Sequence, residues 1–254
     1  MGNVTYVFER VERKFLLTPR QYDGLMRVLI EYMEMDRYGE STILSLYLDT
    51  ADSLLIRRSL EKPVYKEKLR LRSYGVPGEE DDVFLEIKKK VSGVVYKRRV
   101  RMSLAHAMEC LARGAVDKAD GQIGREIAYM LSRYRLHPAV VLAYDRTAYA
   151  EMEPSPDRLR ITIDRNIRSR RTDLDLRLGA EGEPLLSPGM WLMEVKTARA
   201  IPMWLCAALD QYGIRQTSFS KYGRVYERSL RAGQTRAVRP AAAKGGIADA
   251  VCHV

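Results

Sequence analysis

The chain has 254 residues, of which 46% are apolar and 30% charged, a balance typical of a globular protein with a substantial core. Its 43 lysines and arginines outnumber its 33 acids, and the net charge of +10 favours an anionic partner such as nucleic acid, an acidic membrane or a phosphorylated molecule. Three widely spaced cysteines and three histidines argue against a disulfide framework and a histidine-ligated zinc centre. The sequence has neither a signal-peptide pattern nor an apolar run near the roughly 20 residues of a membrane helix, so we expect a soluble, cytoplasmic protein.

The first half of the sequence combines strand patterns with short helices. A strand is predicted over residues 5–17. Thr18-Pro19 is a typical helix start, with threonine as N-cap and proline at the first helical position, and this helix is predicted to run to about Met35. The next predicted elements are a strand over 42–48, a short helix over 53–60, a strand over 65–74, and a hairpin of strands over 83–91 and 94–102.

The second half begins with two predicted helices, over 103–113 and 123–135, which form an insertion between two sets of strands. The elements predicted after them are a hairpin of strands over 139–151 and 159–163, a short strand or loop over 166–178, a strand over 191–197, and helices over 202–212 and 222–230. Residues 231–254 lack periodicity and are predicted to be a disordered tail. We therefore expect one domain over residues 1–230.

Six strand segments share an alternation of charged and apolar side chains. In one of them, Lys68, Arg70 and Arg72 alternate with Leu69 and Leu71, so a strand would carry the cations on one face. The other five segments are Glu86-Ile87-Lys88, Lys97–Arg101, Tyr144-Asp145-Arg146, Arg160-Ile161-Thr162 and Glu194-Val195-Lys196. A single such face commonly meets solvent, but closing eight strands into a barrel turns all of these faces inward. The pattern predicts an α+β fold, an antiparallel eight-stranded β-barrel tunnel with flanking helices.

An interior crowded with lysine and arginine repels itself unless anions enter it. Arginine suits phosphate because its planar fork bonds two oxygens at once. Glu12, Glu86 and Glu194 offset part of the charge, and carboxylates beside phosphates are typical of sites that bind a divalent metal. The residues therefore predict a metal-assisted phosphoryl-transfer site.

The order of these motifs resembles the VTC polyphosphate polymerase domain, a member of the triphosphate tunnel metalloenzymes alongside the CYTH proteins. The motifs are Arg10-x-Glu12-x-Lys14, Tyr47-Leu48-Asp49-Thr50, Lys68–Tyr74, Glu86-Ile87-Lys88, Lys97-Arg98-Arg99, Tyr144-x-Arg146, Arg160-x-Thr162-x-Asp164, Glu194-Val195-Lys196 and Ser220-Lys221-Tyr222. The resemblance covers about residues 5–228. CYTH enzymes begin with two glutamates before the lysine, and Arg10 in place of the first favours the polymerase branch.

The resemblance implies transfer of the γ-phosphate of ATP to a growing polyphosphate chain, with Mn²⁺ or Mg²⁺ as cofactor. It assigns catalytic roles to Lys14, Arg70, Arg72 and Lys221. The implied phosphate-binding residues are Arg10, Lys68, Lys88, Lys97, Arg99, Tyr144, Arg146, Arg160, Lys196 and Ser220. The implied metal ligands are Glu194 and, more weakly, Glu12 and Glu86.

Two alternatives stay open: a tripolyphosphate or nucleoside-triphosphate hydrolase in the same tunnel, and a non-enzymatic polyanion-binding module. The expected partners are ATP and inorganic polyphosphate or triphosphate. Nucleic acid is not expected, because the sequence lacks the clustered aromatics of single-strand binders. Asp49 and Asp164 are interpreted as caps rather than ligands, and His106 and His137 as surface residues.

Overall fold

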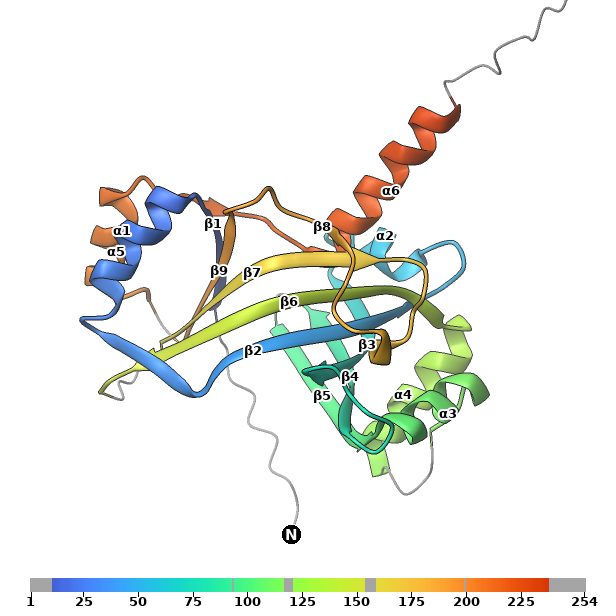
Figure 1. The fold of residues 1–254 in the computed structure, drawn as a ribbon. Helices are drawn as coiled ribbons and strands as arrows, with labels where there is room; N and C mark the ends of the chain where they lie inside the picture. The colour runs from blue at the N-terminus through green and yellow to red at the C-terminus, as the bar shows by residue number, and fades with distance from the viewer. Residues whose placement is uncertain (1–10, 93, 117–120, 154–158, 199, 238–254) are drawn as a thin grey trace, which may run out of the picture.

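The computed structural model describes residues 11–92, 94–116, 121–153, 159–198 and 200–237. Within these ranges the chain forms one antiparallel sheet of ten strands, with helices packed on both of its faces (Figure 1). This confirms the predicted α+β class. None of the helices in the described ranges is both long enough and apolar enough to cross a membrane.

Eight of the strands are long, in agreement with the prediction. They are β1 (Val11–Leu17), β2 (Met33–Asp49), β3 (Tyr65–Tyr74), β4 (Asp82–Val91), β5 (Val94–Ser103), β6 (His137–Glu151), β7 (Arg160–Arg170) and β9 (Trp191–Thr197). Two further strands, β8 (Glu183–Pro184) and β10 (Gln216–Thr217), have two residues each and pair with β7 and β1.

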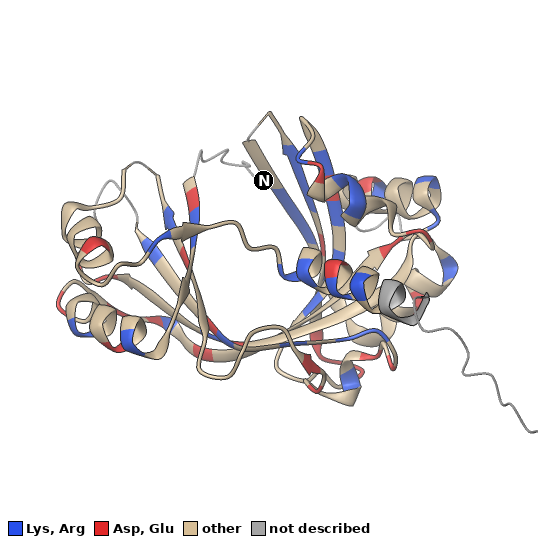
Figure 2. Ribbon diagram, turned by 90° about the horizontal axis from the view of Figure 1, so that it is seen from above, with Lys and Arg blue, Asp and Glu red and all other residues tan. Residues whose placement is uncertain are grey.

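The strand order is β10-β1-β9-β7-β6-β2-β3-β4-β5. Among the described residues no ladder joins β5 to β1, so the predicted barrel is not closed by hydrogen bonds. The sheet instead curves until its two ends face each other across an interior (Figure 2). This curvature turns the charged strand faces toward one another, as the tunnel prediction requires.

The helices are α1 (Pro19–Leu29), α2 (Leu54–Leu60), α3 (Leu104–Arg113), α4 (Gly121–Tyr134), α5 (Met203–Gln211) and α6 (Lys221–Ala237), with a short 3₁₀ helix at Leu176–Leu178. Thr18 and Gln21 form a capping box at the start of α1, and Ser103 caps α3, as predicted. Asp49 accepts hydrogen bonds from the backbone N–H groups of Leu55 and Ile56, which confirms its predicted role as a cap of α2.

Three element boundaries differ from the prediction. Helix α1 ends at Leu29 rather than near Met35, and Met33 already pairs with Glu151 of β6. The second strand of the β6–β7 hairpin continues to Arg170. Helix α6 runs to Ala237, so residues 231–237, predicted as part of the tail, are helical, while 238–254 lie outside the described residues.

Three apolar clusters hold these layers together. Leu69, Leu71 and their neighbours on the outer face of β2–β6 pack beneath α3 and α4. Ile161 and Val195, on the outer face of β7 and β9, pack with α1 and α5. The third cluster lies on the inner face, where α2 and α6 cover Ile43 and neighbouring residues of β2 and β6. The inner face is therefore apolar under α2 and α6 and charged elsewhere.

Candidate active site

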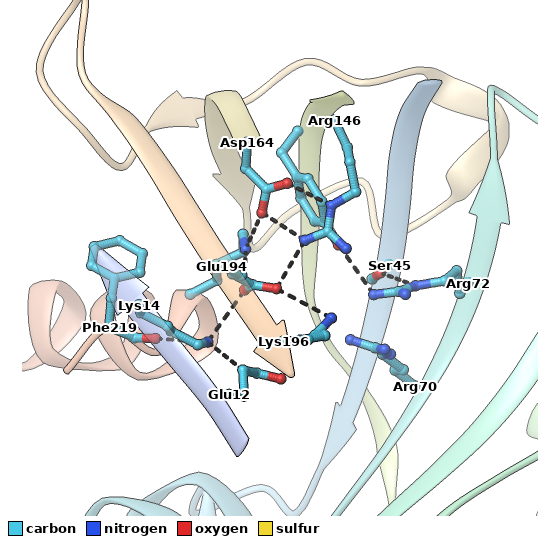
Figure 3. A network of polar contacts seen from close by, with 12 residues as sticks. Glu12, Lys14, Ser45, Arg70, Arg72, Arg146, Asp164, Glu194, Lys196 and Phe219 are labelled. Atoms are coloured by element: carbon cyan, nitrogen blue, oxygen red, sulfur yellow. Dashed lines mark hydrogen bonds and ion pairs between the residues drawn. The ribbon is translucent and has the colours of Figure 1, made fainter. Parts of the chain in front are cut away.

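Alternation along eight strands places the charged side chains on the inner face. The cross-strand register aligns Lys14 with Glu194, Lys68 with Lys88, and Arg70 with Glu86. Side chains from both ends of the sheet point into the shared interior, as the labelled residues in Figure 3 show. The interior has two walls of different composition.

We call the first wall the carboxylate cluster; it comprises Glu12, Lys14, Arg146, Asp164, Glu194, Lys196 and Lys221. At its centre, the buried Glu194 carboxylate contacts four cations. Its Oε1 lies 3.3 Å from the Nζ atoms of both Lys14 and Lys221. Its Oε2 accepts a hydrogen bond from Arg146 at 3.1 Å and lies 3.7 Å from the Nζ of Lys196. Burial alone would raise the pKa of Glu194, but these cations hold it well below its usual value.

Asp164 is the second buried carboxylate of this cluster. Arg146 donates to both of its oxygens, from Nε at 2.6 Å and from an Nη at 2.8 Å, and Lys221 donates to Oδ2 at 2.5 Å. The interpretation of Asp164 as a cap is therefore wrong, because this residue lies within β7 and pairs with two cations. Burial opposes ionisation of Asp164, yet Lys221 and Arg146 lower its pKa. Lys221, at the first turn of α6, thus ties the helix to the sheet.

Lys14 of β1 also belongs to the carboxylate cluster. Its Nζ lies 3.4 Å from Glu12 Oε1 and donates to the carbonyl oxygen of Phe219 at 3.1 Å. Since Lys14 also contacts Glu194, one ammonium group bridges two carboxylates of neighbouring strands (Figure 3).

We call the second wall the basic wall; it comprises Lys68, Arg70, Arg72, Glu86, Lys88, Lys97 and Arg99. Arg70 donates twice to Oε2 of the buried Glu86, at 2.9 and 2.7 Å, and Lys97 lies 2.8 Å from its Oε1. Burial would raise the pKa of Glu86, but Arg70, Arg72 and Lys97 lower it to about 2. Glu86 is thus the one carboxylate among the seven residues of the basic wall, and the other six are cations.

Tyr144 connects the two walls, because it contacts a residue of each. Arg72 donates to the hydroxyl of Tyr144 at 3.1 Å and to Ser45 at 3.3 Å. The Tyr144 ring lies in turn 4.5 Å from the Nζ of Lys221, a cation–π contact with the carboxylate cluster. Figure 3 shows Arg70 and Arg72 opposite Lys196 and Glu194. The walls therefore form one continuous polar interior.

Two lysines of the basic wall and the neighbouring Tyr47 have pKa values shifted toward neutral pH. Burial, with the repulsion of neighbouring lysines, lowers the pKa of Lys68 to about 8. Burial likewise lowers the pKa of Lys97 to about 8, although Glu86 acts in the opposite direction. Burial opposes ionisation of Tyr47, but Arg70, which donates to its hydroxyl at 3.0 Å, and Lys68 lower its pKa to about 7. The lowered pKa of Tyr47 reports nearby positive charge, and at Lys68 the repulsion of neighbouring lysines adds to the effect of burial, so a bound anion would relieve both.

Three predicted site residues are not part of the interior network that the structure describes. Arg160, near one end of β7, pairs with Asp36 at 2.6 Å and is largely exposed. Ser220 accepts a hydrogen bond from the backbone N–H of Gly223, so it caps the start of α6. Arg10 lies outside the described residues.

The predicted metal ligands do not converge on one point. Within the described ranges no group of three histidine, cysteine, aspartate or glutamate side chains is placed to hold an ion. Glu86 belongs to the basic wall, whereas Glu12 and Glu194 flank Lys14 on adjacent strands. Mg²⁺ and Mn²⁺ sites on phosphates typically use one or two carboxylates and complete the shell with phosphate and water oxygens, which Glu12 and Glu194 fit.

Two residues of the interior are missing from the predicted site. Asp164 and Tyr47 both stand in the motifs of the sequence, but neither was assigned to the site. The signal that could have found them is the same period of two, since Asp164 follows Thr162 and Tyr47 follows Ser45 on inward-facing strands.

The curved antiparallel sheet with a charged interior defines a protein of the triphosphate tunnel type. The family model of the VTC domain matches residues 9–229, and the chain belongs to this family. A comparison with curated protein sequences gives no match.

Two solved structures are similar to this chain over most of its length. A Vibrio parahaemolyticus protein proposed to be an adenylate cyclase has a TM-score of 0.50 and 12% identity, over 87% of this chain and 99% of that one. A proposed adenylyl cyclase from Hippeastrum, described with a dominant triphosphatase activity, has a TM-score of 0.49 and 16% identity, over 88% and 96% of the two chains. The first of these similarities shows the fold alone.

Proposed function

We propose that the protein is a polyphosphate polymerase that transfers the γ-phosphate of ATP to the end of an inorganic polyphosphate chain. Membership of the VTC family supports this reaction. The structural observation that carries the proposal is the basic wall opposite the carboxylate cluster. Nucleotide and polymer phosphates would contact the first, and Glu194 with Glu12 would hold the divalent metal. ATP as donor agrees with the cytoplasmic location that the sequence predicts.

The reaction breaks the bond between the γ-phosphorus and the oxygen that bridges it to the β-phosphate. A terminal oxygen of the polyphosphate chain forms the new bond to the same phosphorus, and ADP leaves. The attacking oxygen is already ionised, so no general base is needed. The histidines agree with this, because His106 belongs to α3 and His137 is an exposed residue at the start of β6.

The protein side chains contribute mainly charge and position. Arg70 is held by Glu86 and Tyr47, and Arg72 by Ser45 and Tyr144, so both guanidinium groups are fixed before substrate enters. Preorganised donors of this kind stabilise charge that develops in the transition state without reorganising. Lys14 and Lys221 supply further ammonium groups beside Glu194. A bound Mn²⁺ or Mg²⁺ would neutralise phosphate charge and polarise the transferred group.

The test is incubation of the purified chain with ATP and Mn²⁺ or Mg²⁺, with separation of the products by polymer length. A polymerase yields ADP and long-chain polyphosphate in matching amounts. Orthophosphate as the sole phosphate product would establish the hydrolase instead, and metal-independent binding without ADP release would establish a polyanion-binding module.

Two variants make this test specific. Lys221→Ala removes the ammonium group shared by Asp164 and Glu194 and should abolish turnover. Lys89→Ala removes the same charge from the opposite face of the sheet, where Lys89 pairs with Glu126 at 3.0 Å, and should keep it. Equal activity of the two variants would contradict the assignment of the interior as the active site.

A further inference from the structure

A row of lysines extends the basic wall beyond its arginines. Lys66 and Lys68 precede Arg70 on the same face of β3, and the register pairs Lys66 with Lys90 and Lys68 with Lys88 on β4. Alternate residues of a strand are about 6.8 Å apart, so the row from Lys66 to Arg72 is about 20 Å long. This length exceeds what three phosphates in the reacting site would occupy.

Within the described part of the chain, none of these four lysines forms an ion pair with a carboxylate. Burial lowers the pKa of Lys66, and the charges of Lys90, Lys88 and Lys62 lower it further, with no acidic group acting against them. The Nζ of Lys66 donates instead to the carbonyl oxygen of Ser59 in α2 at 3.2 Å. A compact group of like charges without a counter-ion is unfavourable, and a bound anion removes that cost.

The row ends in an open groove. Lys62, Pro63, Val64, Lys66 and Lys90 line a hollow of about 450 Å³ between the loop after α2 and the β3–β4 ladder. No aromatic side chain belongs to this lining, and the hydroxyl of neighbouring Tyr65 donates to Glu67 on the other face of β3. Single-stranded nucleic acids bind largely by stacking their bases on aromatic rings. The groove therefore fits a polyanion without bases.

Lys88 lies between the groove and the arginines, because it stands between Glu86 and Lys90 on the inner face of β4 and pairs with Lys68 of β3. A chain that extends from the arginines along β3 and β4 would thus meet Lys68 and Lys88, then Lys66 and Lys90, and then Lys62.

We infer that the groove of Lys62, Lys66 and Lys90 is a chain-holding subsite, which binds the phosphate units of a polyphosphate that lie beyond the reacting end. This inference rests on the proposed function for the identity of the chain. It assigns the groove to long polymers, because a short one is held entirely by the arginines and the carboxylate cluster.

Equilibrium binding separates the subsite from the active site. The affinities of tripolyphosphate and long-chain polyphosphate are measured without ATP or metal, for the wild type, for K62A/K66A/K90A, and for Lys89→Ala as the matched control. The triple variant should bind the long chain about tenfold more weakly and tripolyphosphate unchanged. The slope of log K against log salt for the long chain should become shallower by about 2, at about 0.7 per lost contact.

Several outcomes would overturn the inference. An unchanged long-chain affinity, an equal loss for tripolyphosphate, or an equal effect of Lys89→Ala would remove the subsite. Single-stranded RNA that displaces long-chain polyphosphate from the groove at equal concentration would assign the site to nucleic acid. Failure of polymerase activity with chain-length discrimination intact would refute the proposed function alone, whereas a wild type that binds neither polyphosphate would refute both. Circular dichroism of the triple variant verifies its fold.

Discussion

Replacement of Glu194 by glutamine tests the reasoning about the interior most directly. The side chain is 6% exposed and its carboxylate contacts Lys14, Arg146, Lys196 and Lys221. Glutamine keeps the shape and one acceptor oxygen but leaves four cations with less counter-charge. Breaking a buried ion pair by removing one partner costs about 3–5 kcal/mol, and the retained oxygen places Glu194→Gln near the lower end.

A loss of about 3 kcal/mol corresponds to a decrease in melting temperature of about 6–12 °C for a chain of this size. Urea or thermal unfolding of the ligand-free protein measures it. Glu183→Gln is the control, because Glu183 is 80% exposed and pairs with Arg228 at 3.8 Å, so its loss should cost at most about 1 kcal/mol. Tripolyphosphate without metal should bind Glu194→Gln at least as tightly as the wild type, while turnover with ATP and Mn²⁺ should collapse. A destabilisation no larger than that of the control, or weaker metal-free binding, would refute the reasoning.

Three further predictions concern the pKa values of the basic wall, the pKa of Tyr47 and the packing of α1. The lowered pKa values of Lys68 and Lys97, both about 8 against a usual 10.5, mean that the unfolded chain binds more protons between these values. Ligand-free stability should therefore rise from pH 8 to 10.5 while tripolyphosphate affinity falls, and calorimetry at pH 9 should show proton uptake on binding; binding without proton uptake would contradict these assignments. Tyr47, with a pKa of about 7, should give a phenolate absorbance near neutral pH that Tyr47→Phe removes and tripolyphosphate suppresses, and identical titrations of both proteins would disprove it. Gly24→Ala should destabilise the fold by about 1–3 kcal/mol in urea unfolding, because a Cβ there would lie 2.4 Å from the ring of Tyr212, and the double variant with Tyr212→Ala should relieve the clash.

The inward faces could be predicted because a strand encodes its faces locally. The period of two identified Lys68, Arg70 and Arg72 as one face and Leu69 and Leu71 as the other, and the structure confirms both. Helix starts were predictable for the same reason, since a cap acts within one turn of chain. Both features depend on residues a few positions apart.

Features that depend on distant partners were not predictable. The apolar spacing after Leu29 continues the helical pattern, but pairing of Met33 with Glu151 converts this segment into strand. The local sequence around Asp164 is typical of a turn, and its place in the site depends on its distant partners Arg146 and Lys221. Glu86 had the same local pattern as Glu194, and their separation into different walls is fixed by the strand order.

The strand order distributes the carboxylates unevenly between the two walls, and this affects how a triphosphate would bind. Glu12, Asp164 and Glu194 lie on β1, β7 and β9, at one end of the sheet, while β3–β5 contribute Glu86 among six cations of the basic wall. The carboxylate cluster has four cations against three carboxylates and attracts a polyanion only weakly without a metal, whereas the basic wall has six cations against one carboxylate and attracts it strongly. Changes in the carboxylate cluster should therefore alter the dependence of turnover on metal concentration, and changes at Arg70 or Arg72 should weaken binding with and without metal. Because Glu86 fixes Arg70 and Glu194 restrains Lys14 and Lys221, each wall also carries the counter-charge that keeps its cations in place until substrate arrives.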